Sequence, residues 1–256
     1  IRRPPRSTLF PYTTLFRSAG RTKAISGNIS KNPAEFRNPG GDNMKKLFFR
    51  YIWFILGILI NSFGIAFITK ASLGTSPISS VPYVLSFRFP LSFGGFTFLL
   101  NMLFILGEVV LLRRQFRPYQ YLQIVVNMIF SSFIDVSMTL LGSFTPVHFA
   151  SQILSLLAGC AILALGICVE VAPNVLVVPG EGIVKAIAQV SRKKFGSVKV
   201  IFDVTLILTA ACLSLLFFRH LNGLGIGTII SALLVGRIVN FIQKHLHILK
   251  RIPTAA

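Results

Sequence analysis

Two short segments decide the fold: LGTSPISSVPYVLSFRFP at residues 73–90 and PNVLVVPGEGIVKAIAQVS at residues 173–191. Each is too apolar for an ordinary loop and too short to span a bilayer, which takes about 20 apolar residues in a helix. Each pattern is typical of a break at proline and glycine, followed by a short amphipathic helix. We predict a re-entrant or discontinuous helix at both places, which membrane depth tolerates only where protein or a cavity shields it. The alternative is a helix lying flat at the membrane interface.

The composition is that of a membrane protein. Of 256 residues, 53% are hydrophobic and only 13% are charged, whereas a soluble domain carries about a quarter charged residues. There are 26 Lys and Arg against 7 Asp and Glu, a net charge of +19 that on a soluble chain would suggest nucleic-acid binding. The apolar runs are too long for that interpretation. We therefore expect a lipid bilayer as the partner, and no nucleic acid.

Six apolar runs are long enough to span a bilayer: 47–69, 92–112, 119–141, 149–172, 197–218 and 222–243. Basic residues gather before the first run, between the second and third, between the fourth and fifth, and after the sixth. By the positive-inside rule these gaps face the cytoplasm. The sequence thus predicts an all-α, polytopic membrane helix bundle with both termini cytoplasmic.

The two short segments also align with each other at a constant offset of 102 residues. The same offset matches glycine with glycine and proline with proline: Gly57 with Gly159, Gly64 with Gly166 and Pro77 with Pro179. Each half has three spans, an odd number, so the second half enters the membrane upside down. We predict a 3+3 inverted-topology repeat, an arrangement common in transporters, with the first repeat at 44–142, the second at 143–245 and a cytoplasmic tail at 246–256. The matched glycines predict close helix packing.

Residues 1–43 do not fit this pattern. The chain opens with Ile1, and residues 1–18 resemble a translated sequencing-adapter artefact, with a targeting peptide as the alternative. The codons of Gly40-Gly41-Asp42 can spell a bacterial ribosome-binding site just before Met44. We expect translation to start at Met44 and residues 1–43 to be a disordered, non-native leader.

Several motifs point to one group of proteins: Gly64-Ile65-Ala66, Leu73-Gly74-Thr75-Ser76-Pro77, Pro179-Gly180-Glu181-Gly182, Phe195-Gly196 with Lys199 and Asp203, and Gly225-Ile226-Gly227-Thr228. With these motifs the chain resembles the YczE/YyaS/YitT-type family of bacterial integral membrane proteins over about residues 44–245. The resemblance implies a multi-span protein of the bacterial inner membrane. It supplies no established substrate, so it supports architecture and location more than function.

All five acidic residues after Met44 fall in or beside predicted membrane segments: Glu108, Asp135, Glu170, Glu181 and Asp203. An ionised group at the bilayer centre costs about 2.5–3.5 kcal/mol, so such residues usually face a cavity or a partner. Depth along the helices, at about 1.5 Å per residue, pairs Asp203 with Arg237 near the inner face and Asn101 with Asp135 near the outer face. Either pair serves a solute pathway or only holds helices together.

Two further acids sit at segment ends. Glu181, between two glycines, is a candidate for holding a cation or proton, with Lys185 one turn further on. The alternative is an ordinary helix start, where a glutamate is favourable at the positive end of the helix dipole. Glu108 is interpreted as structural, because it lies close enough to the span end to extend towards Arg113.

The sequence contains no phosphate loop, nucleophile elbow or zinc motif. We therefore expect no enzyme, no cofactor and no metal. The leading hypothesis is a secondary transporter or permease for a small solute, and the alternative is a non-transporting membrane scaffold or accessory protein; a homo-oligomer is compatible with either. The expected substrate or ion pathway comprises Thr75, Ser76, Pro77, Asn101, Asp135, Pro179, Gly180, Glu181, Gly182, Lys185, Asp203 and Arg237.

Overall fold

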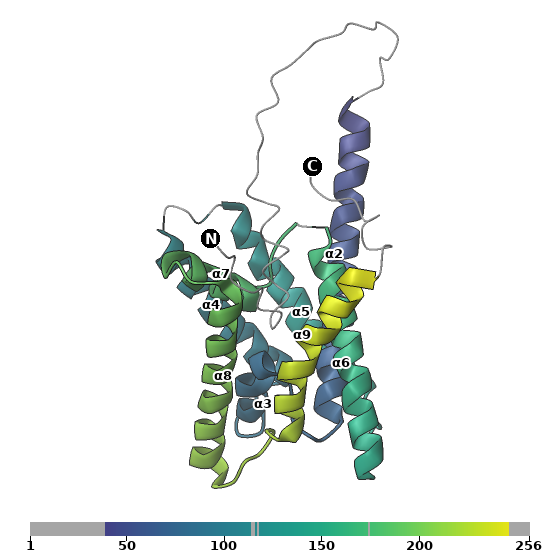
Figure 1. Ribbon diagram of the computed structural model, residues 1–256, viewed down its shortest axis with the longest axis vertical. Helices are drawn as coiled ribbons and strands as arrows, with labels where there is room; N and C mark the ends of the chain where they lie inside the picture. Colours follow the sequence, from purple (N-terminus) through teal and green to yellow (C-terminus); the bar gives the residue numbers. More distant parts are fainter. Residues whose placement is uncertain (1–38, 114–115, 117, 174, 246–256) are drawn as a thin grey trace, which may run out of the picture.

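The computed structural model describes residues 39–113, 116, 118–173 and 175–245 (Figure 1). Most of the expected leader and the whole expected tail, at residues 1–38 and 246–256, lie outside the described residues. The first described helix, α2, spans Pro39–Lys70 and so begins five residues before Met44.

The described chain is built from helices and contains no β-strand. After α2 come the short 3-10 turn η1 (Pro77–Ser79), α3 (Ser80–Ser86), α4 (Phe93–Leu112), η3 (Pro118–Tyr121) and α5 (Leu122–Leu140). The second half contains α6 (Phe149–Val171), α7 (Pro179–Val190), α8 (Phe195–Phe218) and α9 (Ile226–His245). Six helices are long and apolar enough to cross a membrane: α2, α4, α5, α6, α8 and α9. The predicted membrane helix bundle, with two short helices between its spans, is confirmed.

The second half repeats the three spans and the short helical segment of the first half in the same order. The helices α2 and α6 pack against each other, with α5 on α2 and α9 on α6. In each half, the span that follows the short helical segment packs on the short helical segment of the other half: α4 contacts α7, while α8 contacts η1 and α3. Figure 1 shows α3 towards the lower end of the bundle and α7 towards the upper end, as an inverted repeat requires.

Small residues make the close α2–α6 contact possible. A Cβ atom built on Gly64 would lie 2.6 Å from the Leu163 Cα, and one built on Gly166 would lie 2.5 Å from the Asn61 backbone nitrogen. Real side chains cannot approach so closely, so only glycine permits this spacing of the two helices. The predicted close packing at the matched glycines is confirmed.

Prolines begin both short helical segments, where the missing N–H of proline costs nothing. Pro77 starts η1 and Pro179 starts α7. The two segments meet inside the protein, where Ile78 packs against Gly180, as expected for re-entrant segments. Gly74 enables the turn before η1 with a φ of +121°, a value that side chains rarely adopt.

Candidate functional site

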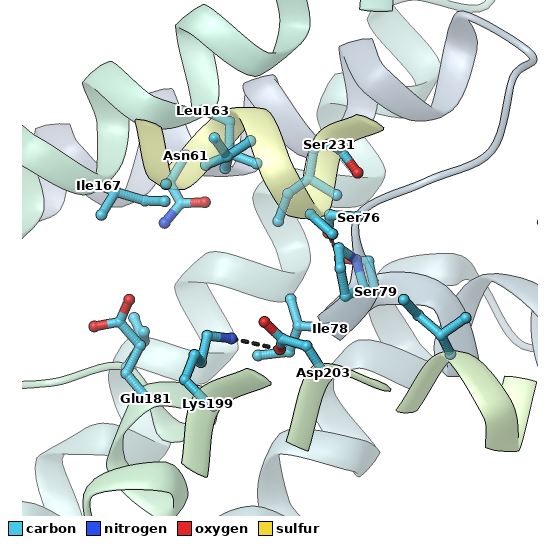
Figure 2. A pocket seen from close by; sticks show the side chains of 18 of the residues that line it. Asn61, Ser76, Ile78, Ser79, Leu163, Ile167, Glu181, Lys199, Asp203 and Ser231 are labelled. Carbon is cyan, nitrogen blue, oxygen red and sulfur yellow. Dashed lines mark hydrogen bonds and ion pairs between the residues drawn. The ribbon is translucent and has the colours of Figure 1, made fainter. Parts of the chain in front are cut away.

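A cavity of about 450 Å³ lies between the two repeats. Both short segments reach it, the first through Ser76–Ser79 and the second through Val178, Gly180 and Glu181. The remaining lining comes from α2, α4, α5, α6, α8 and α9. Most of the wall is apolar and a few polar groups converge on it (Figure 2), which is the usual character of a small-molecule site.

The cavity gathers seven of the twelve residues predicted from the sequence: Ser76, Pro77, Asn101, Gly180, Glu181, Asp203 and Arg237. The other five do not line it: Thr75, Asp135, Pro179, Gly182 and Lys185. Thr75 supports the site from behind, since its backbone N–H donates to the Thr228 Oγ1 at 3.2 Å and its hydroxyl bonds with that of Thr69 at 2.8 Å. This arrangement ties the first short segment to α9 and α2.

One wall of the cavity is charged. Lys199 Nζ lies 2.6 Å from Asp203 Oδ1, one turn apart on α8, and Figure 2 shows the Glu181 carboxylate beside this pair. Within the described residues, no hydrogen bond or ion pair is made by the Glu181 side chain. Burial raises the pKa of Glu181 above its ordinary value although the Lys199 cation opposes this shift. The wall therefore presents a carboxyl group able to take up or release a proton.

The predicted pair Asp203–Arg237 is wrong for this conformation. Both residues line the cavity, but Asp203 is on α8, Arg237 is on α9, and Asp203 binds Lys199 instead. Their matching depth brings the two residues to the same cavity, but depth does not reveal that the cavity separates their helices. Lys199 is one turn away from Asp203 on the same helix, so this pair forms without any contact between two helices.

The predicted pair Asn101–Asp135 is also wrong. Asn101 Nδ2 donates to Asn127 Oδ1 at 2.8 Å. Asp135 instead accepts hydrogen bonds at the start of α4, from the Gly94 backbone N–H at 2.7 Å and from the Ser92 hydroxyl at 2.6 Å. Because α4 and α5 are antiparallel neighbours, the start of α4 faces the end of α5, and Asn101 lies two turns away from that point.

Several polar residues of the site were not predicted from the sequence. Asn61 lines the cavity from α2 and donates its Nδ2 to Glu170 Oε2 at 2.8 Å, which joins α2 to α6. Lys199, Ser79 and Ser231 also line the wall. An amide within an apolar span was a usable signal for Asn61, and the four-residue spacing from Asp203 was a usable signal for Lys199.

Together these features define a polytopic α-helical membrane protein made of two inverted repeats around an internal cavity. The His, Cys, Asp and Glu residues that the structure describes form no cluster of three able to hold a metal ion. The chain belongs to a family of unknown function, DUF6198, whose sequence model matches residues 48–244. No curated protein and no solved structure shows a significant match.

Proposed function

We propose that the protein is a secondary transporter that moves a small solute through the cavity between its repeats. The observation that carries this proposal is the cavity itself, which lies where the two proline- and glycine-broken segments meet. Inverted repeats with a site at their broken segments are the architecture of many transporters. Glu181 and Asp203 supply the acidic groups of the site. We also propose a bacterial inner-membrane location with both termini cytoplasmic, and kinship with the YczE/YyaS/YitT-type proteins.

A difference between the two repeats supports the proposal. In the first repeat α4 packs along α5, and Asn101 binds Asn127 across that contact. In the second repeat the equivalent helices, α8 and α9, face each other across the cavity. An inverted-repeat transporter in one of its two end states has this property, because one repeat is closed and the other is open. The second end state would exchange the two arrangements.

The experiment compares two cysteine pairs in a chain whose three native cysteines are replaced by alanine. The pair Asn101→Cys with Asn127→Cys reports closure of the first repeat, and its symmetry mate, Asp203→Cys with Ile229→Cys, reports closure of the second. Ile229 lines the cavity, as Asp203 does. The control pair, Leu208→Cys with Ile229→Cys, uses a residue of α8 whose side chain is 60% exposed.

We expect both symmetry-related pairs to cross-link in membranes, and we expect cross-linking of the first pair to suppress the second. This result would mean that the two repeats close in turn. If Asp203→Cys with Ile229→Cys cross-links no better than the control pair, the second repeat does not close. That outcome would contradict the transport proposal and favour the scaffold alternative.

A further inference from the structure

A buried carboxyl group outside the cavity has an unusual environment. Glu108 on α4 is 1% exposed, and its neighbour Gln123, at the start of α5, is 2% exposed. The helix α7 covers them, with Gly182 packed directly on the Glu108 carboxyl group. A side chain at residue 182 would fall onto that group, so α7 sits closer to Glu108 than any residue other than glycine would allow.

The hydrogen bonding of this pair is incomplete. Gln123 Nε2 donates to Glu108 Oε2 over a long distance of 3.5 Å. The remaining oxygens, Glu108 Oε1 and Gln123 Oε1, are buried and have no hydrogen-bond partner among the described residues. Each is an acceptor, so neither can satisfy the other while Glu108 is ionised. Leaving such groups unpaired in a protein interior is costly.

We propose that Glu108 and Gln123 form a proton-binding site that holds α7 against α4. A proton on Glu108 Oε1 donates to Gln123 Oε1, while Gln123 Nε2 donates to Glu108 Oε2. This cyclic acid–amide pair uses one proton to satisfy both orphan oxygens. A metal ion fits poorly, because Ca²⁺ and Mg²⁺ need about six oxygen ligands and Gly182 occupies the space beside the carboxyl group.

Loss of the proton would leave a buried negative charge whose surroundings suit it poorly. From α7, Lys185 acts electrostatically on Glu108, whereas α5 contributes the uncharged Gln123. The third helix packed on α4, α3, carries Tyr83, which contacts Phe93 at the far end of α4. Ionised Glu108 requires additional donors, and the Gly182 backbone packed on the carboxyl group excludes them while α7 keeps its position. The Lys185 ammonium group could become such a donor only if α7 shifts to bring it onto the carboxylate in place of Gly182. Loss of the proton therefore favours a displacement of α7 from its present position.

This displacement would reach the cavity, because Glu181 precedes Gly182 in the first turn of α7. The proton site would then regulate the position of Glu181, and this last step alone rests on the proposed transport function. The binding of the proton and its hold on α7 stand independently of transport. The symmetry mate of Glu108 is Ala210, so the first repeat alone carries the site.

The test has two measurements on the full chain in detergent, in the background without native cysteines. Infrared spectroscopy at neutral pH reports the C=O stretch of a protonated carboxyl group in the unmodified protein and in Glu108→Gln. Reaction of Ile183→Cys with a water-soluble thiol reagent reports displacement of α7, because Ile183 is 6% exposed and packs on Gly107 of α4. The control reporter, Val81→Cys, is the symmetry mate on α3 and is also 6% exposed.

The thiol-reaction rate of each reporter is divided by its rate in the Glu108→Gln variant at the same pH. Glutamine at residue 108 keeps both hydrogen bonds of the pair at every pH, so this ratio isolates the effect of the Glu108 proton. We expect a carboxyl signal that Glu108→Gln removes, and a rate ratio at residue 183 that rises about tenfold with pH while the ratio at residue 81 stays constant. A protonated carboxyl signal that is absent from the unmodified protein, or that Glu108→Gln leaves unchanged, would overturn the site. A signal with a pH-independent ratio would overturn the hold on α7. Failure of the α8–α9 cross-link would overturn transport and leave both of these results intact.

Discussion

Replacing Gly64 or Gly166 by alanine should separate α2 from α6 and destabilise the protein. The added Cβ would lie 2.6 Å from the Leu163 Cα in the first case and 2.5 Å from the Asn61 nitrogen in the second. Carbon atoms pack best at about 3.5–4.0 Å, so α2 and α6 must move apart by about 1 Å. The obstructing atoms belong to the backbone, so no rotamer change relieves the clash. Overpacking of this kind costs about 1–3 kcal/mol.

The matched control is Gly236→Ala on α9, where a Cβ meets nothing within 4 Å. It should be neutral or slightly stabilising, since alanine favours a helix over glycine by about 1 kcal/mol. Thermal unfolding, monitored by size-exclusion chromatography, should show midpoint temperatures several degrees lower for Gly64→Ala and Gly166→Ala than for the control. The double variant should lose less than the sum, because one separation of the helices accommodates both methyl groups. Equal midpoints for all variants would refute the packing argument.

Single residues provide three further predictions. Gly74→Ala should destabilise the fold by about 1–3 kcal/mol in thermal unfolding, because its φ of +121° strains any side chain and its Cβ would lie 2.5 Å from the Thr228 Oγ1. Burial raises the pKa of Glu181, so ionisation of this group opposes folding. Part of the free energy of unfolding should therefore be lost as the pH rises above 4.5, the ordinary pKa of this group. The thermal midpoints of Glu181→Gln should lack that part of the pH dependence. Arg237→Asp should raise the cross-linking yield of Asp203→Cys with Ile229→Cys, since an aspartate there can bind the start of α8 as Asp135 binds the start of α4; an unchanged yield would contradict this role.

The fold was predictable because its signals are local. Apolar runs give the spans, and proline with glycine marks the two breaks. The offset of 102 residues relates each span and each short helical segment of one half to its counterpart in the other. Seven of the twelve site residues predicted from these signals line one cavity in the structure.

The pairings were not predictable because depth in a membrane does not specify which helices touch. Asp203 and Arg237 share a cavity and still lie on separated helices. Glu108 illustrates the same point, since its place near a span end predicts a side chain that extends towards Arg113. The structure instead buries it under α7, with 1% of its surface exposed. No local pattern indicates which helix covers a residue, so that prediction was wrong.

The separation of α8 from α9 across the cavity has a physical cause at a position where the sequences of the two repeats differ. In the first repeat the Asp135 carboxylate accepts the first-turn N–H of Gly94, and this bond helps to hold α5 on α4. The symmetry mates in the second repeat are Arg237 and Gly196. A guanidinium group has no acceptor, and its positive charge is unfavourable beside the positive end of a helix. Closing α8 on α9 in the same manner would place donor against donor. In the proposed transport cycle, closure of α8 on α9 therefore requires a hydrogen-bond acceptor between Arg237 and the start of α8. The solute could supply this acceptor, or Asp203 could supply it after separating from Lys199. The second end state would then depend on what the cavity holds.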